Sequence, residues 1–119
     1  MRFPAVAVAV GLMLMVVVID RPAVVEGAIT CPQVQKLLRT CVGYLKHGGN
    51  VEPSCCNGVK SLNNLAKKTP ERRQACRCLK DGAAIIRNIN YTNVALLPGK
   101  CGVRIPYRIS PSLNCNTVT

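Results

Sequence analysis

Large aromatic side chains are nearly absent from this 119-residue chain, which has no Trp and has Phe3 as its single Phe. The three tyrosines make a poor platform for stacking bases, so we expect no nucleic-acid partner. A domain without Phe or Trp also has few bulky groups with which to fill its centre, although aliphatic residues are plentiful. We therefore expect a fold in which covalent cross-links support a weakly filled interior.

Titratable catalytic residues are also scarce. After residue 27 the chain has one His (His47), one Asp (Asp81) and two Glu (Glu52 and Glu71). A Ser-His-Asp triad or a pair of catalytic carboxylates is hard to assemble from this set. A single His likewise disfavours a structural zinc site. We expect a protein that is not an enzyme and that needs no metal and no cofactor.

The apolar run near the N-terminus is too short to span a membrane. It covers Ala5 to Ile19, fifteen residues, whereas a membrane-spanning helix needs roughly 20. A basic start precedes it, and small residues follow at Gly27 and Ala28, which is typical of a secretory signal and its cleavage site. We interpret residues 1–27 as a signal peptide, with cleavage after Ala28 as the alternative, and residues 28–119 as one secreted, extracellular domain.

The domain that remains is strongly cationic. Removing residues 1–27 deletes Arg2 and Arg21 together with Asp20 and Glu26, so the net charge of the chain, +11, is unchanged. Such a charge favours anionic surfaces, including acidic lipid headgroups, pectin-like polymers and microbial membranes. Solubility is the simpler explanation for part of it.

All eight cysteines lie in the predicted domain. An even number of cysteines in a secreted chain indicates four disulfides. The pairs Cys55-Cys56 and Cys76-Arg77-Cys78 are central, because neighbouring cysteines cannot easily bridge each other and each must reach another part of the chain. Two could reach back to Cys31 and Cys41, and two forward to Cys101 and Cys115.

The apolar spacing predicts an all-α fold. Start signals at Thr30, Pro53 and Thr69 and stop signals at Gly48 and Lys67 mark three helices, over residues 31–46, 53–66 and 70–86. A fourth, shorter helix is expected over residues 91–97, ending at Pro98. After Cys101, apolar residues alternate but are interrupted by prolines, which indicates an extended tail lying across the helices rather than a strand. The sequence Asn90-Tyr91-Thr92 is a formal N-glycosylation sequon whose use stays open.

The cysteine spacing, C-x9-C-x13-CC-x19-CxC-x22-C-x13-C, resembles that of the plant non-specific lipid-transfer proteins over the whole predicted domain. The central CC and CxC pairs alone are shared with cereal amylase/trypsin inhibitors. Hydrophilic Arg77 between two cysteines and the pentapeptide at residues 106–110 (PYRIS) resemble type 1 of the family. A second family pentapeptide maps onto residues 68–72, but Lys68 stands where a hydroxyl residue is expected, and Thr69 could cap the helix instead.

The resemblance implies one disulfide pairing among the 105 that eight cysteines allow. The implied pairs are Cys31 with Cys78, Cys41 with Cys55, Cys56 with Cys101, and Cys76 with Cys115. Type 2 relatives exchange the partners of the two CxC cysteines.

The resemblance further implies four disulfide-linked helices around a lengthwise, internal apolar tunnel, with the C-terminal tail as one wall. The candidate lining residues are Val34, Leu38, Val59, Leu62, Leu79, Ala83, Ile86, Leu97, Ile105 and Ile109. By the same resemblance, Arg72 and Tyr107 are polar contacts for the lipid head. Ordinary core packing is the alternative for the apolar residues, a surface charge for Arg72 and a tail anchor for Tyr107.

The implied function is the binding of acyl lipids (fatty acids, lysolipids or phospholipids) and their transfer between membranes or to the extracellular surface. The expected partners are the lipid and, transiently, an anionic membrane surface, and we expect a monomer. The biological role, whether cuticle deposition, defence or signalling, stays open. A cationic antimicrobial protein is an alternative supported by the net charge of +11, and an enzyme inhibitor is disfavoured by the match at residues 106–110.

Overall fold

The computed structural model describes residues 29–119, so the predicted signal peptide lies outside the described residues. Within residues 29–119 every regular element is helical, as the apolar spacing predicts. The elements in chain order are α2 (Cys31–Leu38), η1 (Arg39–Cys41), α3 (Val42–His47), α4 (Pro53–Leu65), α5 (Thr69–Ala84), α6 (Tyr91–Lys100) and η2 (Cys115–Thr117), where η denotes a 3-10 helix. Among these residues no helix is both long enough and apolar enough to cross a bilayer.

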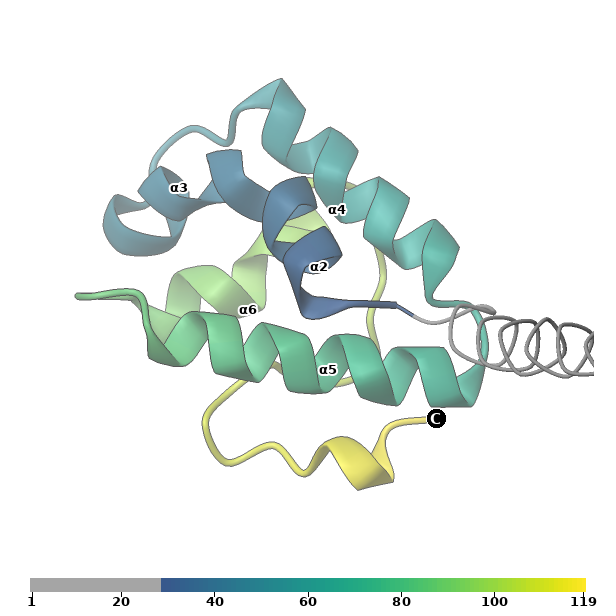
Figure 1. Ribbon diagram of the computed structural model, residues 1–119. Helices are drawn as coiled ribbons and strands as arrows, with labels where there is room; N and C mark the ends of the chain where they lie inside the picture. The colour runs from purple at the N-terminus through teal and green to yellow at the C-terminus, as the bar shows by residue number, and fades with distance from the viewer. Residues whose placement is uncertain (1–28) are drawn as a thin grey trace, which may run out of the picture.

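The helices pack on both sides of α2. In Figure 1, α2 crosses the front of the molecule between α4 above it and α5 below it, and it packs against both. α3 packs against α6, which also contacts α4. The tail after α6 passes behind the helices and returns beneath α5, where η2 packs against that helix.

The first predicted helix is interrupted, contrary to our expectation. It begins as predicted, because the Thr30 hydroxyl accepts a hydrogen bond from the Gln33 amide (3.2 Å) and the Gln33 side chain accepts one from the Thr30 amide (3.4 Å). It then tightens into η1 between α2 and α3. The α4 backbone crosses so closely that a Cβ atom on Gly58 would overlap the carbonyl of Leu37. We attribute the interruption to this close crossing, which a residue with a side chain could not make.

The start of α5 also differs in detail. Thr69 is the first helical residue and Lys68 occupies the cap, so Thr69 does not cap the helix. One Glu71 carboxylate oxygen accepts hydrogen bonds from the amides of Lys67 (3.2 Å) and Lys68 (3.1 Å). Glu71 therefore supplies acceptors for backbone N–H groups at this helix start, where the family pattern would add a hydroxyl.

The last long helix, α6, continues past Pro98 to Lys100, three residues beyond the predicted end. Pro98 has no N–H to donate, but its carbonyl accepts from the amides of Cys101 (3.0 Å) and Val103 (2.8 Å). These bonds close the final turn and direct the chain into the tail.

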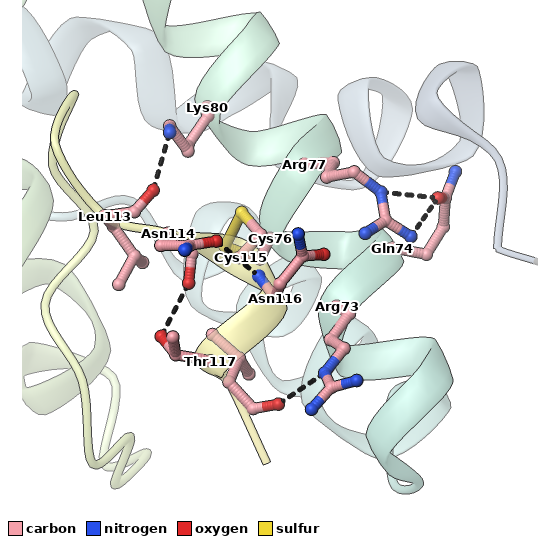
Figure 2. Close-up of a disulfide and its surroundings, with 11 residues drawn as sticks. Arg73, Gln74, Cys76, Arg77, Lys80, Leu113, Asn114, Cys115, Asn116 and Thr117 are labelled. Carbon is pink, nitrogen blue, oxygen red and sulfur yellow. Dashed lines mark hydrogen bonds between the residues drawn. A yellow bond between two sulfur atoms is a disulfide. The ribbon is translucent and has the colours of Figure 1, made fainter.

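Side chains from α5 hold the tail in place. Cys76 is bonded to Cys115, Arg73 Nε donates to the Val118 carbonyl (2.8 Å), and Lys80 Nζ donates to the Leu113 carbonyl (2.6 Å). Figure 2 shows this disulfide between the two segments, with the Lys80 bond beside it. The predicted tail therefore lies across the helices, tied by its cysteines and by bonds from basic side chains.

The buried core is divided into three clusters rather than one. The first contains Cys41, Tyr44, Cys55, Val59, Leu97, Cys101 and Val103. The second contains Ile29, Val34, Leu62, Ala66, Ala75 and Cys78. The third contains Cys76, Cys115 and Val118. Each cluster includes at least one disulfide cysteine.

Candidate lipid-binding cavity

Four disulfides fix the wall of the cavity. They join Cys31 to Cys78, Cys41 to Cys55, Cys56 to Cys101, and Cys76 to Cys115. These are the pairs that the type 1 resemblance implies. Three of them close loops with sequence separations of 39 to 47 residues, and loops of this length are expected to contribute roughly 4 kcal/mol each through the entropy of the unfolded chain.

A cavity of about 420 Å³ lies among the helices and the tail, within the range typical of small-molecule sites. Its lining follows α5 along its whole length, from Arg72 in the first turn to Ile86 just after the last. At 1.5 Å per residue this corresponds to about 20 Å. The site is therefore elongated along α5.

Eleven of the twelve residues predicted for the site line this one cavity. They are Val34, Leu38, Val59, Leu62, Arg72, Leu79, Ala83, Ile86, Ile105, Tyr107 and Ile109. Leu97 does not line it and belongs to the first core cluster. One helical turn after Leu97, Cys101 is bonded to Cys56, which directs this face of α6 into the core, while Val94 and Pro98 reach the cavity.

The sequence analysis missed part of the lining. The additional residues are Gln35, Arg39, Val42, Leu45, Asn63, Ala66, Ala75, Cys78, Gly82, Ile85, Ile89, Val94, Pro98, Arg104 and Pro106. Val42 and Leu45 continue the apolar stripe of the first predicted helix and could have been found from that periodicity. Ile85 lies in the predicted helix over residues 70–86 but outside the apolar stripe that contains Leu79, Ala83 and Ile86, and Ile89 lies after that helix, so helical periodicity selects neither.

Arg72 stands at the end of the cavity near the start of α5. Its Nε donates to the Ala66 carbonyl (3.1 Å) and its Nη1 to the backbone oxygen of Thr119 (3.1 Å). The guanidinium therefore connects the end of α4, the start of α5 and the tail. A guanidinium carries five N–H donors, so these two bonds leave donors for a further acceptor.

Tyr107 lines the same cavity from the tail. Partial burial raises the pKa of its phenol above the ordinary value of 10.0, and the positive charge of Arg72 acts in the opposite direction. The phenol is therefore neutral at physiological pH and keeps its O–H as a hydrogen-bond donor.

The chemistry of the lining is that of a binding site. Most of the lining residues are aliphatic, the charged ones are Arg39, Arg72 and Arg104, and no Asp or Glu is among them. Within residues 29–119 no group of three or more His, Cys, Asp or Glu side chains is placed to hold a metal ion. The arrangement suits an apolar chain with an anionic or polar end.

Comparison with known proteins agrees with this geometry. Residues 31–115 match the family described as "Protease inhibitor/seed storage/LTP family". A non-specific lipid-transfer protein of Apium graveolens is 59% identical over 113 residues, which are 95% of each chain. Residues 31–115, the part of the chain that matches the family, include all eight cysteines.

Two solved structures share the fold. Barley non-specific lipid transfer protein 1, in complex with a lysophosphatidylcholine, is 38% identical with a TM-score of 0.74, covering 76% of this chain and all of that one. The wheat protein, complexed with two phospholipid molecules, is 42% identical with a TM-score of 0.72 over the same shares. The chain belongs to this family and, within it, to the type 1 non-specific lipid-transfer proteins, which are carriers rather than enzymes.

The titration of Tyr107 tests the geometry at this end of the cavity. We expect the ¹³Cζ resonance of Tyr107, assigned with Tyr107→Phe, to titrate with a midpoint above 10.0, and at still higher pH in Arg72→Gln because the cation lowers the pKa. A phenol with a raised pKa stabilises the fold below its unfolded pKa, and this contribution is lost as the pH rises through the folded pKa. The free energy of unfolding should therefore fall above about pH 10.

Arg73→Gln is the control for this titration, because it also removes a bond to the tail, at Val118, without removing the charge that acts on Tyr107. The partial burial of Tyr107 beside Arg72 would be contradicted if the titration midpoint of Tyr107 lay at or below 10.0. It would also be contradicted if Arg72→Gln and Arg73→Gln moved that midpoint equally.

Proposed function

We propose that this protein binds acyl lipids in the cavity along α5 and carries them through water between membranes or to the extracellular surface. The observation that carries the proposal is a largely aliphatic cavity lined by eleven predicted residues, which come from α2, α4, α5, the turn after α5 and the tail. The lipid complexes of the barley and wheat relatives support it.

The energetic role of the cavity follows from the cost of exposing an acyl chain to water. Each buried methylene contributes ~0.8 kcal/mol, so a sixteen-carbon chain has a gross transfer term of about 12 kcal/mol, reduced by the costs of ordering and association. Aliphatic walls impose little directional chemistry, so the cavity should accept fatty acids, lysolipids and phospholipids alike.

Arg72 and Tyr107 are proposed as the polar contacts for the lipid head. Both line a mostly aliphatic cavity, and they lie close enough for the charge of Arg72 to act on the Tyr107 phenol. Arg72 supplies a charged group for a carboxylate or phosphate, while Tyr107 supplies a hydroxyl donor and a ring that can cover the first part of the acyl chain.

A paired substitution in α5 tests the cavity. Ala83 is buried and lines it, whereas its neighbour Ala84 is exposed and does not. We expect Ala83→Phe to weaken binding of a fluorescent fatty acid at least tenfold, because the ring occupies the space of several methylenes, and Ala84→Phe to leave the affinity unchanged. Displacement by lysophosphatidylcholine measures the affinity, and circular dichroism checks that both variants fold.

Equal affinities for the two variants, or no saturable binding by the oxidised protein, would refute the carrier function. Membrane disruption by a cationic protein would then be the function to test, by dye leakage from anionic vesicles.

The role of Arg72 is tested by changing the charge of the ligand. Arg72→Gln should weaken binding of palmitate about tenfold, because the variant loses a charge-assisted hydrogen bond to the carboxylate. The affinity for hexadecanol, which has no charge, should change much less. Arg77→Gln is the matched control, because Arg77 is exposed on the same helix and bonds only to Gln74. An equal loss for both ligands would mean that Arg72 acts through the tail rather than on the lipid head.

Secretion follows from the same proposal, since residues 1–27 have the organisation of a signal peptide and the disulfides need an oxidising compartment. N-terminal sequencing of the protein exported from a plant cell should begin at Ala28, or at Ile29 if cleavage follows Ala28. A mature protein that retained the apolar run would contradict this assignment.

A further inference from the structure

One large apolar side chain both lines the cavity and faces solvent. Ile85, directly after α5, is 75% exposed and is among the cavity-lining residues. The other large exposed apolar residues within 29–119 are Leu96 (49%) and Leu65 (44%), and neither lines the cavity. At Ile85 the apolar interior is therefore continuous with the outer surface.

The turn that carries Ile85 is fixed by backbone bonds on both sides. The amides of Ile85 and Ile86 donate to the carbonyls of Gly82 and Ala83, and the Asn90 amide donates to the Leu45 carbonyl in α3 (2.9 Å). The exposed isoleucine is thus presented on an ordered turn, which lowers the entropy lost when it is buried against another surface.

The turn itself carries a positive charge. Arg87 is exposed two residues after Ile85. Asp81, one turn earlier in α5, is the last acidic residue of the sequence. An exposed apolar side chain two residues from an exposed arginine matches the surface of a bilayer that contains anionic phospholipids, where the arginine meets a phosphate and the isoleucine meets acyl chains.

The opposite end of α5 is bonded to the tail. There Arg72 and Arg73 donate to the backbone oxygens of Thr119 and Val118, and Figure 1 shows the C-terminus at this end, while the turn between α5 and α6 lies at the other end of α5. At the Ile85 turn the lining itself reaches solvent.

We propose that the turn carrying Ile85 and Arg87 is the membrane-docking surface, which inserts into an anionic bilayer. This inference rests on the proposed carrier function and adds the surface by which the protein meets the membrane. Arg87 gives the encounter its dependence on anionic lipid and on salt.

Vesicle binding tests the docking surface. The oxidised protein is sedimented with vesicles of equal parts phosphatidylcholine and phosphatidylglycerol, and with vesicles of phosphatidylcholine alone. Ile85→Ser should weaken binding to the anionic vesicles about tenfold, because it removes one inserted side chain. Arg87→Gln should weaken it about fivefold, as expected for one charge near the surface.

Matched controls remove the same groups elsewhere. Leu96→Ser and Leu65→Ser delete exposed apolar side chains on α6 and at the end of α4, and Lys60→Gln removes an exposed charge on α4. We expect these three variants to bind anionic vesicles within about twofold of the unchanged protein. The proposed docking surface is refuted if Ile85→Ser and Arg87→Gln also bind anionic vesicles within about twofold of the unchanged protein. It is also refuted if the control variants lose as much affinity for the vesicles as these two do.

A second readout separates this inference from the function on which it rests. Fluorescent fatty acid binding without vesicles should be the same for Arg87→Gln and the unchanged protein, because Arg87 does not line the cavity, while transfer of the probe between anionic vesicles should slow about fivefold. No fatty-acid binding by the unchanged protein would overturn the carrier function. Normal binding with unchanged transfer by Arg87→Gln would overturn the docking surface alone.

Discussion

The four disulfides are the constraint on which the rest of the structure depends. A domain without Trp or Phe has few bulky groups to fill its centre, and most of its buried residues belong to three small clusters, each with at least one disulfide cysteine. Packing of this kind contributes less than one continuous core, because hydrophobic stabilisation grows with the apolar area removed from water. Cross-links compensate by restricting the unfolded chain, so a cavity can remain between the clusters.

Basic residues serve two purposes on the same helix. Arg73 and Lys80 donate to carbonyls of the tail, and Arg72 does so while also facing the cavity. A tail rich in proline has few backbone partners of its own, so these side chains provide donors that a neighbouring strand would otherwise supply. Part of the net charge of +11 is thus explained by the fold, and the remainder, including Arg39 and Arg87, is free to meet anionic surfaces.

Local patterns and the family resemblance together predicted most of the fold, and most of the residues that they predicted for the site line the cavity. Tertiary contacts account for what they missed. Capping residues and apolar spacing located the helices, and the family resemblance supplied the disulfide pairing. The interruption before Cys41 depends on the approach of Gly58 to Leu37, which no local pattern reports. Leu97 was misplaced because a disulfide one turn later orients its helix face. The bonds from Arg73 and Lys80 depend on the path of the tail, which sequence alone does not describe.

The divided core also bears on how this protein should respond to hydrostatic pressure. Pressure destabilises folded proteins roughly in proportion to the internal void volume that unfolding eliminates. The space of about 420 Å³ among the helices belongs to the folded state alone, and an acyl chain within it would convert that space into packed volume. The lipid-loaded form should therefore resist compression better than the empty form, which makes pressure-induced unfolding a measure of cavity occupancy that needs no label on the lipid.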